Sequence, residues 1–389
     1  MNNFLIKQEN LTPPQPKIST IYTGNQKIVS FGERNIFPIF LLDAVNDSPF
    51  QSSILASKRS MIKGAGLKNP KETIKRPNLS ETWQELFDKI VTDYVFYEAF
   101  AIQAILNKDG KTFSFYHQPV DEVRFAPMNK ENKIETAYLS KNWNKWNNKN
   151  TESIKMFGSE EPQQGEAYLL YFKRYKPQEY YYSIPDYYSG LYWILADAEI
   201  SKYYFNFTKN NFSANRYIIL PNEVDEDKKM ELYEALRTNY SGSENAGNFL
   251  LLFGENGVLP QLGELKTNDA DLFNAVNDIV LKNLCSANRL SSPTLAGLST
   301  ASGFSSKSDE LIAAQGLFKL NVINEARQFI LKHLNELLAM NGFEKCLEVE
   351  DYNLREEFEG STDENTDKIN DASTDANDNN NLQNVDSNE

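Results

Sequence analysis

The sequence predicts an α+β protein, because segments with two different hydrophobic periods follow each other along the chain. Residues 83–94 repeat large apolar side chains at helical spacing, whereas residues 98–117 alternate with a period of two, which is typical of strands. After Pro185, three long segments return to the helical period. A chain of 389 residues, 40% of them hydrophobic, is long enough to bury these segments in a substantial core.

The first ninety residues are expected to hold an extended arm and then helices. Residues 1–30 are polar and contain prolines, and we interpret them as an extended N-terminal arm. Two short helical patterns follow between residues 35 and 62, separated at residues 47–49, and the second stops at Gly64. A stronger helical pattern begins after residues 78–81, which we interpret as its N-terminal cap.

Strands are expected to dominate the next eighty residues. The alternating stretch over residues 98–117 turns at Asn-Lys-Asp-Gly and predicts a β-hairpin. Further short strands are expected at residues 121–127, 134–140 and 166–174. These helices and strands together predict a small α+β domain that ends near residue 180.

The second half of the chain is expected to contain three long helices and a β-α-β insert. The first helix starts after Pro185 and runs to about residue 211, and the second starts near residue 268. Between them, the strand patterns RYIILP and NFLLLFG flank a helix that begins with three acidic residues, which suit the positive end of a helix dipole. The third helix follows a cap at residues 306–309 and ends before residues 341–342, an Asn-Gly stop signal.

Two segments carry little apolar material. Residues 291–307 form a long, hydroxyl-rich loop between two helices, and such loops usually have a function or are disordered. Residues 356–389 hold 11 of the 54 acidic residues and one of the 40 basic residues, so the net charge of −14 falls to about −4 without them. We interpret residues 356–389 as a disordered acidic tail, because their apolar content is too low to build a core.

The sequence contains no constellation of residues that supports an enzyme. The two histidines, His117 and His333, are far apart in the chain, and we expect each to be packed or hydrogen-bonded rather than catalytic. No phosphate-binding P-loop, zinc-protease, serine-hydrolase or calcium-loop motif occurs. We therefore expect no catalytic residues, no metal site and no cofactor.

The cysteines and the hydropathy indicate a soluble protein made in the cytoplasm. Cys285 and Cys346 lie in apolar-periodic stretches, which is typical of reduced, packed thiols. No apolar run is long enough to span a bilayer, and the first residues lack the basic and apolar regions of a secretion signal. We expect no membrane partner.

Aromatic side chains cluster around the start of the first long helix. They could stack on the bases of single-stranded nucleic acid, but basic residues are sparse around them. Aromatic residues along a long helix more often pack against neighbouring helices or subunits, and we favour this interpretation. The cluster comprises Tyr180, Tyr181, Tyr182, Tyr187, Tyr188, Tyr192, Trp193, Tyr203, Tyr204 and Phe205.

Three stretches, in this order and spacing, resemble the portal protein family of tailed bacteriophages. The first is similar to the opening segment of portals from phages of Bacteroidetes-type hosts and reads FGERNIFPIFLLDAVNDSPFQSSILASKRSMIKGAGL. The second joins IPDYYSGLYWILADAEISKYYFNFTKNNFSANRYIIL to GSENAGNFLLLF, and the third is LSSPTLAGLSTASGFSSKSDELIAAQGLFKLNVINEARQFI. Just before the loop the chain reads SANRLSSP, where the family often has a His or basic residue and Val-Pro.

The resemblance implies a portal-like protomer with an α+β wing, two long stem helices that flank a small β-α-β clip, a tunnel loop and a long C-terminal helix. The helical crown that many portals carry at the C-terminus is not expected here. The implied boundaries are 1–30 for the N-terminal arm, 31–185 for the wing, 186–211 and 266–290 for the stem helices, 212–265 for the clip, 291–307 for the tunnel loop, 308–355 for the long helix and wing closure, and 356–389 for the tail.

The resemblance also implies a function without catalysis. The chain is expected to form a ring homo-oligomer, a dodecamer, at one capsid vertex of a virion, with the protein made in the bacterial host cytoplasm. Its expected partners are double-stranded DNA in the channel, the terminase large subunit, a head-tail adaptor, and the major capsid or scaffold protein. Two alternatives stay open: another minor virion or adaptor protein without a DNA channel, and an undetected enzyme on an α+β scaffold.

Functional residues are expected in the loop and in the clip. Small hydroxyl side chains suit a channel for sliding DNA, because fixed Lys or Arg contacts would add salt-dependent affinity and hence a barrier to motion. The expected channel-lining residues are Ser299, Thr300, Ser302, Phe304 and Lys307. The clip helix is expected to bind the adaptor and the terminase through Asp225, Glu226, Lys228, Lys229, Glu231 and Glu234.

Overall fold

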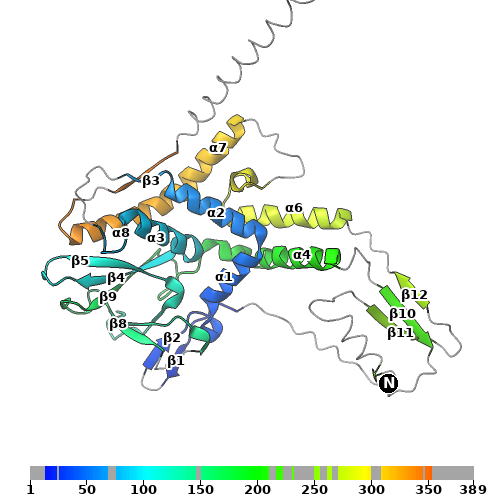
Figure 1. Cartoon of the computed structure of the whole chain (residues 1–389), viewed down its shortest axis with the longest axis horizontal. Coiled ribbons are helices and arrows are strands. Elements are labelled where there is room, and N and C mark those ends of the chain that lie inside the picture. Colours follow the sequence, from blue (N-terminus) through cyan, green and yellow to red (C-terminus); the bar gives the residue numbers. More distant parts are fainter. Residues whose placement is uncertain are drawn as a thin grey trace, which may run out of the picture.

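A computed structural model shows an α+β fold in which one large sheet packs against helices and two long helices extend away from it (Figure 1). The mixed helix and sheet content confirms the predicted fold class. The structure describes residues 14–23, 26–68, 76–145, 150–209, 216–221, 230–231, 249–254, 261–264, 270–298, 308–344 and 347–352. The predicted acidic tail, residues 356–389, lies outside them.

Helices α1 (Phe37–Asp47) and α2 (Pro49–Lys63) are the two predicted short helices. The Ser48 side chain separates them and caps α2 by accepting a hydrogen bond from the backbone N–H of Gln51 at 3.2 Å. Gly64 ends α2 with a φ of +55°, and a Cβ on it would lie 2.3 Å from the carbonyl oxygen of Glu350. Only glycine therefore fits this position.

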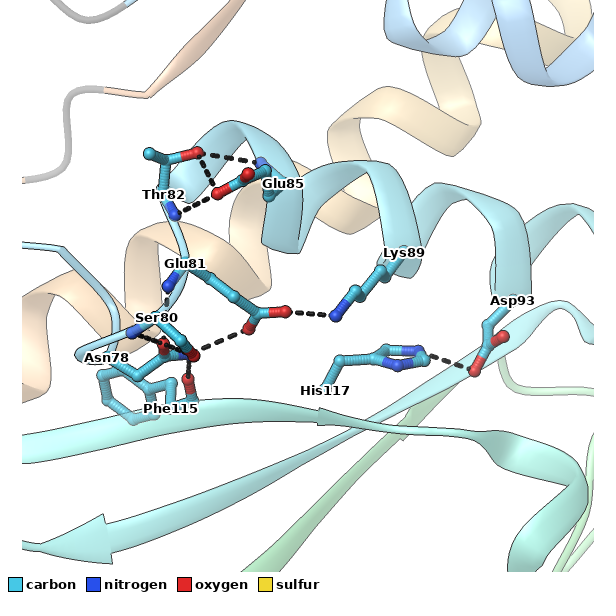
Figure 2. Close-up of polar contacts among 9 residues, drawn as sticks. All are labelled: Asn78, Ser80, Glu81, Thr82, Glu85, Lys89, Asp93, Phe115 and His117. Atoms are coloured by element: carbon cyan, nitrogen blue, oxygen red, sulfur yellow. Dashed lines mark hydrogen bonds and ion pairs between the residues drawn. The ribbon is translucent and has the colours of Figure 1, made fainter.

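The cap of helix α3 (Trp83–Tyr97) is Thr82, which corrects the prediction of a cap within residues 78–81. Thr82 Oγ1 accepts from the backbone N–H of Glu85 at 3.2 Å, and the Thr82 N–H donates to Glu85 Oε2 at 2.7 Å (Figure 2). Asn78 instead holds the preceding turn, because its Oδ1 accepts from the N–H groups of Ser80 and Glu81 at 2.9 and 2.8 Å.

Eight strands form the large sheet in the order β1-β2-β6-β7-β8-β9-β4-β5. The predicted hairpin is β4 (Ala99–Leu106) with β5 (Phe113–Gln118), and the predicted short strands are β6 (Val123–Phe125), β7 (Thr136–Leu139) and β9 (Ala167–Lys173). Neighbouring strands are antiparallel, except for β9 and the unpredicted β8 (Glu152–Met156), which run parallel.

The predicted extended arm contains two strands of this sheet, which corrects the interpretation of residues 1–30. Strands β1 (Thr20–Thr23) and β2 (Gln26–Val29) form a hairpin, and Val29 pairs with Phe125 of β6. Each strand has four residues, which is too short for an alternating pattern to stand out from a polar background.

A buried arginine fixes the turn that precedes α1. Arg34 and Asn35 both have positive φ angles, 56° and 61°, and Asn35 Oδ1 accepts from the N–H of Phe31 at 2.9 Å. Arg124 of β6 bonds both Asn35 oxygens and donates to the Asp121 carbonyl oxygen at 2.8 Å. Burial lowers the pKa of Arg124 to about 10. The oxygens that accept hydrogen bonds from this cation are backbone and amide oxygens rather than a carboxylate.

The two long helices lie side by side and lead to a small separate sheet (Figure 1). Helix α4 (Leu191–Lys209) follows the 3₁₀ turn η4 (Asp186–Gly190), and α6 (Ala270–Ala287) is the second predicted helix. Strands β10 (Arg216–Pro221) and β11 (Phe249–Gly254) are parallel, as a β-α-β unit requires, and the unpredicted β12 (Gln261–Glu264) pairs antiparallel with β10.

The last predicted helix is interrupted by π-helical backbone. Helix α7 (Ser308–Phe318) passes through η6 (Lys319–Ile323), a π-helix, into α8 (Asn324–Met340). Gly342 ends it with a φ of +78°, and the N–H of Phe343 donates to the Leu338 carbonyl at 3.1 Å, which completes a Schellman cap. Strand β13 (Glu348–Glu350) then pairs with β3 (Gly66–Lys68) beside the end of α2.

One hydrophobic core joins the sheet to all the large helices. Phe100 of β4 packs against Phe172 of β9 and Phe329 of α8, with ring centroids 4.9 and 6.1 Å apart. The parts of α4 and α6 nearest the sheet belong to this core through Ile194 and Leu284. Farther along, Phe205 of α4 and Ile279 of α6 are exposed, although both fit the helical period of apolar residues in the sequence.

Candidate interaction site at the helix junction

Almost all the predicted site residues lie outside the described part of the chain. This applies to Ser299, Thr300, Ser302, Phe304 and Lys307 of the loop, and to Asp225, Glu226, Lys228, Lys229 and Glu234 of the insert. Glu231 is described: it lies next to Met230 in helical backbone, and both side chains are exposed. The site is therefore built from the first residues of the loop and the helices around them.

Helix α2 holds the start of the polar loop through two serines one helical turn apart. Ser53 Oγ donates to the carbonyl oxygen of Ala296 at 2.6 Å, and Ser57 Oγ donates to that of Leu295 at 2.6 Å. The 3₁₀ turn η5 (Pro293–Ala296) presents these carbonyls, and Gly297 follows with a φ of +70°. The first residues of the predicted loop are thus ordered and fixed to the protein body.

The same helix is bonded to α4 at its N-terminus. Asp197 of α4 is buried, and its Oδ2 accepts from Ser48 Oγ at 2.5 Å and from the backbone N–H of Phe50 at 2.9 Å. The carboxylate therefore lies where the dipole of α2 favours negative charge. Burial raises the pKa of Asp197, and the hydrogen bonds from Ser48 and Phe50 only partly offset this effect.

Helix α2 is also bonded to the end of α6. The side-chain amides of Gln51 and Asn288 pair reciprocally: Asn288 Nδ2 donates to Gln51 Oε1 at 2.8 Å, and Gln51 Nε2 donates to Asn288 Oδ1 at 3.3 Å. Both side chains are buried. Because unpaired buried amides are costly, this pair fixes the position at which α6 gives way to the loop.

The 3₁₀ turn η4, which leads into α4, packs closely against the end of α6 at Gly190 and Ala287. A Cβ on Gly190 would lie 2.7 Å from the Cβ of Ala287, so the absence of a side chain sets the spacing of the helices. A cavity of about 440 Å³ opens beside this contact, with Asp186, Trp193 and Arg289 in its lining.

Charged side chains join the junction to the large sheet and to α8. Lys176 lies 2.8 Å from Glu98 Oε2 and 2.7 Å from Asp186 Oδ1. Arg289, just beyond α6, lies 3.7 Å from both Asp186 and Glu325, the latter in the first turn of α8. Burial favours the protonated form of Asp186, but the hydrogen bond and the charge of Lys176, together with the charges of Arg289 and Lys58, outweigh burial and hold the pKa of Asp186 below its ordinary value.

The aromatic cluster divides into a packed part and an exposed part. Tyr182 and Tyr187 are buried, whereas Tyr192 and Phe205 are each 66% exposed. Further partly exposed aromatic residues on α4 are Trp193, Tyr203 and Tyr204. Packing within the chain thus accounts for Tyr182 and Tyr187, and the exposed aromatic side chains along α4 present apolar area of the kind found at protein interfaces.

The two histidines are packed and hydrogen-bonded, as the sequence analysis predicts. His117 Nε2 lies 3.0 Å from Asp93 Oδ2, which also accepts from the N–H of Val120 (Figure 2). His333 Nδ1 lies 2.8 Å from Glu336 Oε2, and its ring stacks on Phe172 with centroids 4.3 Å apart. The first pair joins β5 to α3, and the second lies within α8.

Metal-binding clusters and membrane-spanning helices are both absent from the residues that the structure describes. Among these residues, His, Cys, Asp and Glu side chains nowhere gather in threes that could hold a metal ion. None of the helices in the same residues has both the length and the apolarity to cross a bilayer.

Comparison with known proteins gives a likeness of fold. No protein-family model matches the sequence. No curated protein matches it. A chain from the neck of an empty gene transfer agent (GTA) particle, computed with C6 symmetry, is similar with a TM-score of 0.51 and 14% identity over 80% of this chain and 83% of that chain.

Two other solved structures are similar over most of their length. A chain from the virion of a native GTA particle gives a TM-score of 0.53 at 14% identity and covers 88% of this chain and 91% of that chain. A chain from the neck of a native GTA particle, computed with C12 symmetry, gives 0.52 at 11% identity over 85% and 84%. At these identities the similarity shows a shared fold.

Sequence reasoning did not find the residues that build the junction. Ser48 before Pro49 is a visible cap signal, but its partner Asp197 is 149 positions away. Gln51 and Asn288 are 237 positions apart. A single sequence carries no local signal for such pairs, because each partner alone looks like an ordinary polar helix residue.

Proposed function

We propose that this chain is a structural subunit of a ring-shaped head-tail connector in a phage-like particle, and that its role is that of a portal without catalytic activity. The observation that carries this proposal is the likeness of fold, which extends over 80–88% of the chain, to chains of gene transfer agent necks and virions. Two of those necks were computed with cyclic symmetry, C6 and C12, which suits a ring. The proposed ring is a homo-oligomer, a dodecamer, at one capsid vertex.

In the proposed protomer, each part of the chain has a place. The large sheet with α1, α2, α3 and α8 is the wing, and α4 and α6 are the stem helices. The three-stranded sheet is the clip, which docks the terminase large subunit and the head-tail adaptor. The wing faces the major capsid or scaffold protein. The other boundaries are those that the resemblance implies, 186–211, 212–265, 266–290, 291–307 and 308–355, whereas the wing extends from 31–185 to include strands β1 and β2.

The proposed channel is lined by the polar loop. Its hydroxyl side chains make weak, replaceable contacts with the phosphates of passing double-stranded DNA, which enters, is retained and leaves through the same channel. The anchoring of Leu295 and Ala296 by Ser57 and Ser53 supports this role. A loop that must meet moving DNA needs a fixed base, because its entry point decides how far the remaining residues reach.

Electron microscopy of the purified full-length chain tests the ring. The expected image is a closed ring with an axial hole. Monomers or open filaments would contradict the proposal and would favour a minor virion or adaptor protein without a DNA channel. An independent mass measurement of the intact oligomer then gives the number of subunits.

Charge substitution in the loop tests the channel. Replacing Ser299, Thr300 and Ser302 together by Arg is expected to slow DNA packaging into proheads, with partial relief as salt rises, because each subunit adds phosphate contacts. Arg at the exposed Ser153 and Ser159 of the wing is the matched control and should leave packaging unchanged. Wild-type packaging by the loop variant at every salt concentration would show that the loop does not touch the DNA.

A further inference from the structure

The outer edge of β5 is closed to further strands. The Asn341 side chain accepts from the N–H of Phe113 at 2.7 Å and donates to its carbonyl oxygen at 2.9 Å. The N–H of Phe115 donates to the Pro77 carbonyl at 2.8 Å, and Asn78 Nδ2 donates to the Phe115 carbonyl at 2.7 Å (Figure 2). Because these outward backbone groups already have partners, no strand can add at this edge.

The hydrogen bonds of the β1 hairpin show which backbone groups face inward. The carbonyl oxygens of Ser19 and Gln15 accept from the N–H groups of Ser30 and Glu33 at 2.7 and 2.9 Å. Bonding direction alternates along an antiparallel strand, so the odd-numbered residues from 15 to 23 direct their N–H and C=O toward β2 and the residues that follow it.

The even-numbered residues therefore direct their backbone groups outward. Ile18, Thr20 and Tyr22 lie in this set, and no residue in the described ranges bonds their outward N–H and C=O groups. Pro14 and Pro16 have the same parity but lack an N–H, so they limit the open edge to Ile18–Tyr22. The Tyr22 side chain, 66% exposed, lies on this open edge.

The closed edge restricts what can cover the open one. Neighbours in a cyclic ring meet through two different surfaces, so a sheet could in principle continue from one copy to the next. The partners of Phe113 and Phe115 prevent β5 from taking part in such a continuous sheet. Any segment that pairs with the open edge of β1 therefore comes from outside the sheet.

We propose that residues 1–13 of a neighbouring copy supply this segment and that Asn3–Ile6 add as a strand to β1. This inference rests on the proposed ring. Phe4, Leu5 and Ile6 are the one apolar run in residues 1–13, and Phe and Ile favour strands, whereas the Asp- and Asn-rich residues 356–389 do not. Thirteen extended residues span about 43 Å, which is enough to reach an adjacent protomer.

A neighbouring copy fits better than the segment of the same chain. The bond from Gln15 to Glu33 carries the chain away from the hairpin turn, along the inner side of the edge. Residues 1–13 would have to reverse at Pro13 and Pro14 to reach their own β1, and prolines in that position cannot donate to the ladder. Strand addition between copies avoids this reversal.

A photo-crosslinker tests the exchange in the assembled full-length protein. With p-benzoylphenylalanine at position 4, we expect covalent links between chains, mapped to residues 18–23. Thr20→Pro removes an outward N–H and none that faces β2, so it should lower the crosslink yield about tenfold while the circular dichroism is unchanged. Thr20→Ala keeps the N–H and is the matched control, with a yield close to that of the wild type.

The outcomes separate this inference from the proposed ring. Links within one chain, links to another surface, or a yield that Thr20→Pro does not lower would overturn strand addition between copies while the ring stands. Protein without rings in electron micrographs would refute both. Because Thr20→Pro acts on the edge itself, deletion of residues 2–13 provides a second variant, which should leave the wing folded and should dissociate the ring at lower urea concentration than the wild type.

Discussion

A methyl group added at position 190 tests how closely α4 and α6 pack. In Gly190→Ala the new Cβ would lie 2.7 Å from the Cβ of Ala287 and 3.8 Å from Leu284 Cδ2. Carbon atoms prefer about 3.5–4.0 Å, so the helices must separate or the backbone must shift, which costs about 1–3 kcal/mol in a packed core. Helix propensity returns at most about 1 kcal/mol of this cost. We expect the free energy of unfolding to fall by about 1–2 kcal/mol.

Two companion variants make this test specific. Ala287→Gly removes the methyl group that Gly190→Ala strikes, so the double variant should recover most of the steric cost, with a coupling energy of about 1 kcal/mol or more. Gly316→Ala in α7 is the matched control, because nothing lies within 4 Å of its added Cβ, and it should be neutral or stabilising. Urea unfolding followed by tryptophan fluorescence measures all four proteins. Gly190→Ala at wild-type stability, or a double variant without coupling, would refute the close-packing argument.

Three further predictions follow from the polar contacts. Ser53→Ala with Ser57→Ala removes two bonds to the loop base, so amide exchange at residues 295–298 should accelerate and stability should fall by about 2 kcal/mol; unchanged exchange would contradict the anchor. Arg124→Met removes the Arg124 bonds to both Asn35 oxygens and leaves the Asn35 carbonyl oxygen without its arginine donor, so the free energy of unfolding should drop by about 3 kcal/mol, which an unaltered melting temperature would disprove. Burial raises the pKa of Asp197 in the folded state, so the stability that this group contributes is fully present below its unfolded pKa near 3.9 and is lost as the pH rises through its folded pKa. Asp197→Asn should remove this pH-dependent loss of stability. Parallel plots of stability against pH for the wild type and the variant would refute the prediction.

The elements with long periodic patterns could be predicted from the sequence. The hairpin of β4 and β5, the parallel pair of β10 and β11, and the Asn341–Gly342 stop all follow from period and turn signals. The cap of α3 shows where local signals fail. Asn78 and Thr82 each precede a glutamate by three residues, so both match a capping box. Thr82 is the cap, whereas Asn78 holds the preceding turn and also donates to the Phe115 carbonyl at 2.7 Å, a contact that only the tertiary structure provides.

The candidate site was less predictable than the fold, because its polar contacts join distant segments. Apolar periodicity tells which face of α2 is buried, but it does not tell which helices cover that face. The hydrogen bonds of Asp197 to Ser48 and of Asn288 to Gln51 determine which helices cover it. Phe205 and Ile279 are exposed for a similar reason. Apolar residues at helical spacing are buried only where another element packs against that face of the helix.

The hydrogen bonds at the base of the loop depend on the side chains of α2 but not on the side chains of the loop. Ser53 and Ser57 donate to main-chain carbonyl oxygens, which every residue type provides. Leu295 and Ala296 can therefore change their side chains without losing these bonds, provided that the 3₁₀ turn is kept, whereas a change of either serine removes one. These two bonds therefore place no requirement on the residue types of the loop, which can suit whatever the loop contacts, while α2 determines the position of the loop. This division suits the proposed DNA channel, in which the base of the loop stays fixed while its side chains contact moving DNA.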